Sequence, residues 1–469
     1  MNANPSLDER YLDFCARSGA IFAAYPQLEA LRHTVFKELL VRRRADGWRD
    51  HVKRWVRPLV KRGRTRAPTR DVDVLLWVEN QREVIVDALL PVYRELVARD
   101  VSVELISFRG PPGMPCARVF DFPARALAPQ WAPAAWEALC DCEPGLREQA
   151  LKRSFYHACA MLGGLYDELH SLLEAAMPKV VLCASTQATG GAALMVASRQ
   201  LGFRSLLLQH GMMQPVYTPL IADRMLTWGP TSNEILVSLG LPPEKLLTVG
   251  SPRHDVIGPS GSGHARAELL SALSLRDRPT FVFFSNGNDL LRNGHAPAEC
   301  SRWLEALAAE HANDLNVVVR LHPDEDGALY RGSRHLVISK EGVGLSTTLE
   351  GSDWIGSLCS TALHDGLLFG KPAWQFYADG WPILADNWRQ GLAHRVSSEQ
   401  QLRNLVQGVL SRGTPRRVDE ELVARVFANH GQATQAVADV VLSTLRPQPT
   451  PLRVSQSSRA GANERGYFS

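Results

Sequence analysis

The sequence of 469 residues lacks the features of several common protein classes. Its first residues, MNANPSLDER, have no basic start followed by an apolar run, and no segment has the roughly 20 consecutive apolar residues of a membrane-spanning helix. The eight cysteines are scattered, and the closest two, Cys140 and Cys142, have no second pair beside them. We therefore expect a cytoplasmic protein with reduced thiols, with neither a disulfide framework nor a zinc site.

Motifs of well-known enzyme classes are also missing. The sequence contains no Gly-x-Gly-x-x-Gly or Walker loop, no His-Glu-x-x-His and no Gly-x-Ser-x-Gly. These absences argue against the usual dinucleotide-binding, P-loop, zinc-protease and serine-hydrolase sites. No metal ligand is expected.

The net charge of +3 is distributed unevenly along the chain. Segment 42–70 carries twelve basic and two acidic residues, with Trp48 and Trp55 among aliphatic side chains. We favour a solvated basic helix that packs on the protein through this apolar stripe, because runs of charge are usually solvated faces. The alternative is an arm that contacts anionic lipid at the inner face of the cytoplasmic membrane. Nucleic acid is not expected, since no recognition motif accompanies the basic residues.

Apolar strand-like runs alternate with helix-like segments along most of the chain. In the first half, strands are expected at 71–79, 101–108, 179–185, 204–211, 222–229 and 245–255, and helices at 81–100, 189–202 and 231–240. In the second half, strands are expected at 279–288, 316–326, 335–340, 353–361 and 372–377, and helices at 299–311 and 362–370. Strands that are apolar on both faces and alternate with helices predict parallel sheets covered on both sides.

The length of the chain and its alternation of strand-like and helix-like segments predict an α/β protein with two doubly wound, Rossmann-like domains that face a cleft. A Gly/Ser-rich segment at 258–270 is the expected linker. The predicted division is a helical basic extension at 1–70, a first domain at 71–262, a second domain at 263–445 and a disordered tail at 446–469.

Polar residues that follow the expected strands of the second domain are candidates for binding phosphate, because ligands bind beyond the carboxyl ends of parallel strands. Arg320 and His322 flank the end of one strand, and the imidazolium and guanidinium together suit a pyrophosphate. Asp365 lies one turn into the next helix, where it suits a ribose hydroxyl or merely interacts favourably with the helix dipole. The acidic DEDG at 324–327 is read as a solvated loop. The full set is Ser285, Asn286, Arg320, His322, Pro323, Ser360, Thr361 and Asp365.

The first domain supplies candidates for acid–base chemistry across the cleft. His210 ends the run SLLLQH, where a strand should reach the cleft, so it suits a general base or a hydrogen bond to phosphate. His254 and Asp255 follow a later strand and are rival bases, and the sequence does not rank the three.

The ordered motifs QHG, TWG, VGSPRHD, VVVRLHP and CSTALHDGLLFGKP, over roughly residues 180–380, resemble those of GT-B glycosyltransferases of bacterial surface polysaccharide synthesis. Similar families include capsule Kdo transferases, polysialyltransferases and CDP-glycerol glycerophosphotransferases. The last resemble this chain in having a His-Gly in the first domain, here His210-Gly211, and a second histidine in the other, here His322. The sequence departs from the common pattern at Cys359, where serine is usual, and at Asp365, where glutamate is frequent.

The resemblance implies a nucleotide-activated sugar bound by the second domain, a glycan or lipid-linked glycan acceptor bound by the first, and no obligatory metal or other cofactor. It implies that His322, Pro323, Ser360 and Thr361 hold the donor phosphates and that Asp365 meets the ribose. The expected activity is transfer of a sugar to a capsule or lipopolysaccharide glycan. A polyol-phosphate transferase, a non-hydrolysing nucleotide-sugar epimerase and a non-catalytic glycan-binding protein remain alternatives on the same fold.

Overall fold

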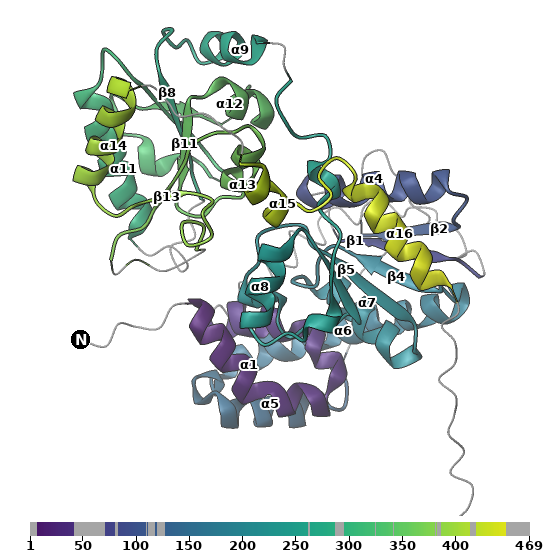
Figure 1. Cartoon of the computed structure of the whole chain (residues 1–469). Helices are drawn as coiled ribbons and strands as arrows, with labels where there is room; N and C mark the ends of the chain where they lie inside the picture. The colour runs from purple at the N-terminus through teal and green to yellow at the C-terminus, as the bar shows by residue number, and fades with distance from the viewer. Residues whose placement is uncertain are drawn as a thin grey trace, which may run out of the picture.

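The chain folds into two domains, each built on a parallel β-sheet (Figure 1). This computed structural model describes residues 7–41, 71–79, 83–108, 110, 118–119, 127–260, 263–286, 295–323, 325–340, 342–379, 381, 386–412 and 419–446. The basic segment 42–70 and the tail from 447 onwards lie outside the described residues. The predicted two-domain, doubly wound α/β class is confirmed.

The first sheet has seven strands in the order β3-β2-β1-β4-β5-β6-β7, all parallel. In that order the strands are Arg118–Val119, Val103–Ser107, Val74–Val78, Val180–Cys183, Arg204–Leu208, Arg224–Thr227 and Leu246–Thr248. Their order reverses between β1 and β4, which makes a crevice at the carboxyl ends of those two strands. The last predicted strand, 245–255, is shorter than expected, because the chain turns into the 3₁₀ helix η6 (Pro252–His254) after β7.

Helices cover both faces of the first sheet, as buried apolar residues on alternate sides of each strand require. On one face lie α1 (Leu7–Ala24), α5 (Ala132–Cys142), α6 (Gln149–Ala176) and α7 (Thr189–Leu201), and on the other lie α4 (Glu83–Ala98) and α16 (Ala433–Leu445). The short turns η1 (Pro26–Leu31), α2 (Arg32–Thr34) and η2 (Val35–Val41) follow α1, so the described part of the N-terminal extension is helical. Helix α8 (Pro230–Ser238) follows β6.

The second sheet has six parallel strands in the order β10-β9-β8-β11-β12-β13. They are Val337–Ser339, Asn316–Arg320, Thr280–Phe284, Trp354–Ser357, Ala373–Phe376 and His394–Val396. Helices α11 (Ala296–Glu310) and α14 (Glu399–Arg412) cover one face, and α12 (Leu345–Gly351) and α13 (Ala362–Leu368) cover the other. The reversal of strand order lies between β8 and β11.

The C-terminal helices return to the first domain. Helix α15 (Glu420–Val426) lies between the two domains in Figure 1, and α16 then packs on the first sheet beside α4. Val437, Ala438 and Val441 of α16 are fully buried in the core of that sheet. The sequence assigned this helix to the second domain, whereas its apolar face completes the first, so the second domain does not extend to 445 as a continuous unit.

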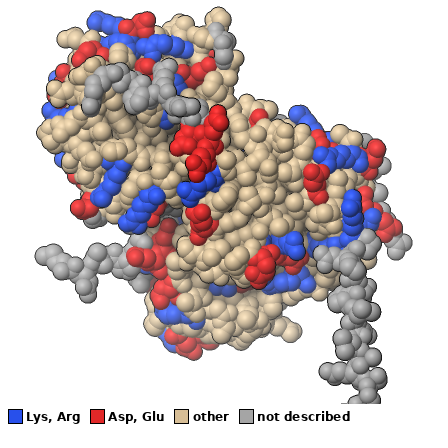
Figure 2. Space-filling view, in the orientation of Figure 1, with Lys and Arg blue, Asp and Glu red and all other residues tan. Residues whose placement is uncertain are grey.

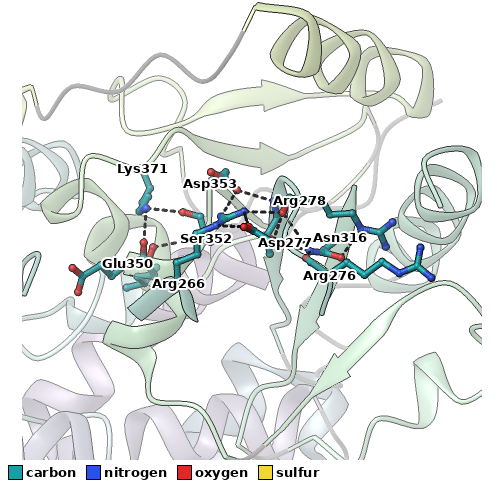
Figure 3. A network of polar contacts seen from close by, with 11 residues as sticks. Arg266, Arg276, Asp277, Arg278, Asn316, Glu350, Ser352, Asp353 and Lys371 are labelled. Atoms are coloured by element: carbon teal, nitrogen blue, oxygen red, sulfur yellow. Dashed lines mark hydrogen bonds and ion pairs between the residues drawn. The ribbon is translucent and has the colours of Figure 1, made fainter. Parts of the chain in front are cut away.

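A polar network fixes the entry to the second domain at the amino ends of β8 and β11 (Figure 3). The second half of the predicted linker is helix α9 (His264–Ala272). From this helix, the Arg266 guanidinium is 3.0 Å from the carboxylates of both Asp277 and Asp353. Lys371 Nζ donates to the carbonyl oxygens of Glu350 and Ser352 at 2.9 and 2.6 Å. The network therefore stabilises the edge of the sheet that lies opposite the carboxyl ends.

Acidic and basic side chains are interspersed on the face of the molecule shown in Figure 2, and no broad surface of one sign covers it among the described residues. None of the described helices is long and apolar enough to cross a membrane.

Candidate functional site

The candidate phosphate-binding residues of the second domain follow three neighbouring strands. The register places Phe284 of β8 opposite both Arg320 of β9 and Ser357 of β11, so these strands end side by side. The residues that the structure gathers at this edge of the sheet are Ser285, Asn286, His322, Pro323, Ser360 and Thr361.

Within this group, the residues after β8 are bound to the protein itself. The Ser285 hydroxyl donates to Glu325 Oε1 at 2.8 Å. Asn286 Oδ1 accepts from the Cys359 amide at 3.0 Å, so it ties the end of β8 to the turn before α13. The other members are more accessible: the side chain of His322 is exposed, and Ser360 and Thr361 are half-buried. Ser360 Oγ nevertheless accepts the Ala362 amide at 3.2 Å, so it also caps the start of α13.

Glu325 is a residue whose role the sequence did not indicate. The DEDG segment was read as a solvated loop, and that reading is wrong for Glu325, which is 2% exposed. Its Oε2 accepts the backbone N–H of His322 at 2.8 Å, while Oε1 holds Ser285. The buried carboxylate therefore fixes the turn that carries His322.

Arg320, the last residue of β9, makes hydrogen bonds to the protein itself. Its Nη1 donates to the Val343 carbonyl and to Thr348 Oγ1, both at 2.7 Å. The guanidinium is thus directed to α12, and its hydrogen bonds there serve the packing of that helix.

In the first domain, the QHG and TWG motifs meet at the ends of β5 and β6. Gln209 is 1% exposed, and its Oε1 accepts the Trp228 amide at 2.7 Å. The indole Nε1 of Trp228 donates to the Gln209 carbonyl at 3.0 Å. These two bonds make Gln209 a fixed support for the loop that follows it.

His210 lies at the start of that loop and is half-buried. Its Nδ1 is 3.5 Å from the hydroxyl of Tyr217, a side chain that is itself 2% exposed. The structure therefore places His210 at the carboxyl end of β5, as the sequence predicts, and it leaves the chemical role of the imidazole as a hypothesis.

His254 and Asp365 come together across the two domains. His254 Nε2 is 2.7 Å from Asp365 Oδ1, and Arg253 Nη2 is 3.0 Å from Asp365 Oδ2. His254 Nδ1 is 2.6 Å from the Ser251 hydroxyl, so the network fits a neutral ring that donates to Asp365 and accepts from Ser251. We call these three residues, Arg253, His254 and Asp365, the interdomain latch.

The charges of the latch agree with this geometry. Burial lowers the pKa of His254, and its hydrogen bond to Asp365 only partly opposes the shift. Burial alone would raise the pKa of Asp365, but the hydrogen bond from His254 and the charge of Arg253 hold it below its ordinary value. A neutral histidine, an ionised carboxylate and a guanidinium therefore share one buried site.

Two residues predicted to bind substrate or act as a base have other partners at the contact between the domains. Asp365 is expected to meet a ribose, but both of its carboxylate oxygens are hydrogen-bonded within the latch, to Arg253 and His254. Asp255, a candidate base, accepts the amides of Ala433 and Thr434 at 2.9 and 2.7 Å and thereby caps α16.

Glycines in the motifs let the C-terminal segment cross the first sheet. A Cβ atom on Gly229 would lie 2.4 Å from the Arg425 carbonyl oxygen, and one on Gly250 would lie 2.1 Å from that of Ala428. Gly250 also has a φ of +94°, which favours glycine. The end of α15 thus lies directly on the TWG turn, and the segment that joins α15 to α16 lies on the VGS turn.

The crevice between β1 and β4 of the first domain is filled by Glu79, another residue that the sequence analysis did not select. Its carboxylate accepts the Gly191 amide at 2.6 Å and the Gly190 amide at 3.2 Å, at the start of α7. Trp77 Nε1 donates to it at 2.6 Å. Burial raises the pKa of Glu79 to about 7, against the lowering effect of these hydrogen bonds.

Between the two domains lies a cavity of about 440 Å³. The first domain and α1 contribute Asp8, Gln209, Met212, Met213, Gln214, Pro215, Trp228, Thr231, Ser232, Glu234, Ile235, Ser238 and Leu239. The second domain and α15 contribute His364, Asp386, Asn387, Arg389, Gln390 and Val426. Its volume lies within the range of small-ligand sites. Its lining comes mainly from the residues after β5 and β6, from α8, and from residues 386–390. We call it the cleft cavity.

His364 is the buried titratable group of the cleft cavity. The ring is 7% exposed, and Nδ1 makes no hydrogen bond within the described part of the chain. Burial lowers the pKa of His364 to about 4, so the ring is neutral at physiological pH. The sequence gives no signal for this role, because His364 lies within an apolar helical segment and not directly after a strand.

Comparison with solved structures supports the fold. MnaA of S. aureus, solved with UDP, has a TM-score of 0.53 and 11% sequence identity, and the match covers 81% of this chain and 99% of MnaA. The UDP-GlcNAc 2-epimerase of Neisseria meningitidis, bound to UDP-GlcNAc, has a TM-score of 0.51 and 13% identity over 79% of this chain and 100% of the epimerase. The UDP-GlcNAc 2-epimerase of Methanocaldococcus jannaschii has a TM-score of 0.50 and 11% identity over 79% of this chain and 99% of that one.

No family model matches the sequence, and no curated protein matches it. At identities of 11–13% the structural likeness establishes the two-domain GT-B fold and nothing finer.

Proposed function

We propose that this protein is a glycosyltransferase that takes a sugar from a nucleotide-activated donor bound to the second domain. The observation that carries the proposal is an asymmetry between the two sheets. In the first, the Glu79 carboxylate already occupies the start of α7, where a phosphate would otherwise bind. In the second, the exposed His322 and the half-buried hydroxyls of Ser360 and Thr361 lie at the corresponding edge.

The proposed chemistry divides between the domains. His322, Ser360 and Thr361 would hold the donor phosphates, and the imidazole would offset charge on the departing nucleotide without a metal. His210 is the proposed general base, because His254 and Asp255 are bound in the latch and in the cap of α16. The proposed acceptor is a bacterial surface glycan, such as a capsule or lipopolysaccharide chain, reached from the cytoplasmic side of the membrane.

The first test is a thermal-shift panel of CMP, CDP, UDP, GDP and ADP on wild type, His322→Ala and His335→Ala. His335 is an exposed histidine before β10, at the opposite end of the same sheet, and serves as the matched control. A nucleotide at 100 times its dissociation constant stabilises a protein by about 2.7 kcal/mol. We expect one nucleotide to stabilise wild type and His335→Ala but not His322→Ala.

The outcome also separates the candidate donors. CMP would point to a Kdo or sialyl donor, CDP to the polyol-phosphate alternative, and UDP or GDP to an ordinary hexose. If no nucleotide stabilises the wild type, the proposed function is wrong and a non-catalytic glycan-binding role gains weight.

A nucleotide-sugar epimerase is the second candidate, because solved epimerases share this fold. An epimerase converts its substrate without an acceptor, whereas a transferase needs one. Incubation with UDP-GlcNAc alone, followed by proton NMR of the anomeric region, distinguishes the two: a second sugar isomer identifies an epimerase.

A further inference from the structure

We propose that the cleft cavity binds an uncharged, hydroxyl-rich sugar, the end of the acceptor glycan, and that His364 and Asn387 select it. This inference rests on the proposed function, to which it adds the position and the charge class of the acceptor. It is carried by three properties of the lining: unpaired buried polar atoms, the balance of charge, and the supply of residues by both domains.

The first property is a set of polar atoms with unused hydrogen-bonding capacity. His364 Nδ1, Asn387 Nδ2 and Asp386 Oδ1 are buried and make no hydrogen bond within the described residues. Asn387 is 1% exposed. Because buried polar groups are nearly always paired, three unpaired atoms around one cavity indicate a ligand that pairs them.

The kinds of atom indicate what that ligand offers. Asn387 Nδ2 only donates, and Asp386 Oδ1 as a carboxylate oxygen only accepts. The neutral ring of His364 carries one donor and one acceptor nitrogen. A hydroxyl group both donates and accepts, so adjacent sugar hydroxyls match such a mixed set, whereas phosphate oxygens match donors alone.

The second property is the absence of an uncompensated positive charge among the described lining residues. Arg389 is the basic residue among them, and it is 3.2 Å from Asp386. The acidic residues are Asp8, Glu234 and Asp386, of which Glu234 is 3.2 Å from Arg425 outside the lining. Among the described lining residues, a carboxylated sugar or a diphosphate would find no cation that lacks an acidic partner, so its desolvation would go largely uncompensated.

The third property is that both domains supply residues to the lining of the cavity. His364 lies in the first turn of α13, and Asn387 lies in the segment after β12, both in the second domain. Gln209, Met212 and Met213 come from the loop after β5 in the first, and the methionines add adaptable apolar surface for the C–H faces of a sugar ring. His210 adjoins this loop, so a sugar in the cavity would lie close to the proposed base.

The test is saturation-transfer NMR in the presence of the nucleotide that stabilises the wild type. The probes are methyl N-acetylglucosaminide and methyl galactoside, both uncharged, and N-acetylneuraminic acid and Kdo, both anionic. We expect the wild type to bind an uncharged glycoside and neither acid. Loss of one neutral hydrogen bond in Asn387→Asp, which keeps the side-chain shape, should weaken the uncharged probe about three- to tenfold.

Matched variants keep the test decisive. Asn404→Asp makes the same change on the exposed face of α14 and should leave binding unchanged. If Asn387→Asp does not fold, Gln390→Glu adds a charge to a partly exposed lining residue, and it should also weaken the uncharged probe.

The outcomes separate this inference from the proposed function. Three results would overturn the inference. An acid could bind more tightly than the uncharged glycosides, neither uncharged glycoside could bind, or Asn387→Asp could bind the uncharged probe as tightly as wild type. Stabilisation by a nucleotide would leave the proposed function standing in each case. If nucleotides do not stabilise the wild type either, both fail.

Discussion

Substitution of Gly250 by alanine should uncouple the C-terminal segment from the first sheet. The new Cβ would lie 2.1 Å from the Ala428 carbonyl oxygen and 2.6 Å from the Ala433 side chain. Since ordinary contact begins at 3.4 Å, the segment has to move by at least 1.3 Å, the difference between 3.4 and 2.1 Å. Backbone on both sides is tied down, so this movement breaks contacts rather than bending a free loop.

The expected loss of stability follows from the hydrogen bonds that the C-terminal segment makes. His430 Nε2 lies 2.9 Å from the His254 carbonyl oxygen, and the Ala433 amide donates to Asp255 at 2.9 Å. One neutral and one charge-assisted hydrogen bond contribute together about 3 kcal/mol. The positive φ of +94° adds a strain of about 1–2 kcal/mol for any residue with a Cβ.

Gly240 is the matched control. Its φ of +91° is nearly the same, and a Cβ there meets nothing within 4 Å. Gly240→Ala should therefore show the strain alone, and Gly250→Ala should lose about 3 kcal/mol more, or roughly 6–12 °C in Tm for a domain of this size. Circular dichroism during heating measures both. Equal losses of Tm in the two variants would refute the close approach.

Two further variants test the buried carboxylates. Asp365→Asn should destabilise the protein by about 3–5 kcal/mol, because it leaves the Arg253 guanidinium buried without a counter-charge. Asp379→Asn removes an ion pair whose carboxylate side chain is 97% exposed and should change the unfolding midpoint little. Similar midpoints for the two variants would exclude the latch. Glu79→Gln should alter the pH dependence of stability. The unfolded chain loses this proton near pH 4.5 and the folded chain keeps it to about 7, so in wild type Glu79 makes the fold less stable as pH rises through this window, by about 3 kcal/mol. Urea unfolding at pH 4.5, 5.5 and 7 should show it as a difference: wild type should lose stability relative to Glu79→Gln as pH rises, while the buried histidines act equally in both proteins. Parallel curves would contradict the raised pKa.

The fold was largely predictable because its signals are local. Each strand of the two sheets that the sequence analysis named is present, since apolar runs between helical segments determine parallel strands. The sequence missed α5 and α6, and it placed α16 in the wrong domain. The amphipathic pattern of a helix shows that it has an apolar face but not which sheet that face covers.

The site was predictable by position more than by role. Strand ends correctly located His210, His322 and Ser360 at the carboxyl edges of the sheets. Arg320 turned to α12, because a long side chain at a strand end can pair on either side of the sheet. Glu79 follows directly after β1, so it obeys the same strand-end rule, although the predicted strand at 71–79 included it as its last residue.

Several residues of the motifs that carry the resemblance lie at the interface between the two domains. Trp228, His254 and Phe427 pack at the domain interface, with ring centroids of Trp228 and His254 5.1 Å apart. Trp228 also lines the cleft cavity and lies 6.4 Å from His364, whose neighbour Asp365 belongs to the latch. A ligand in the cavity therefore contacts residues that are one step from the charges holding the domains together. Such residues need not touch a ligand to matter, because they set the distance between the carboxyl edge of the second sheet, with His322, and that of the first, with His210.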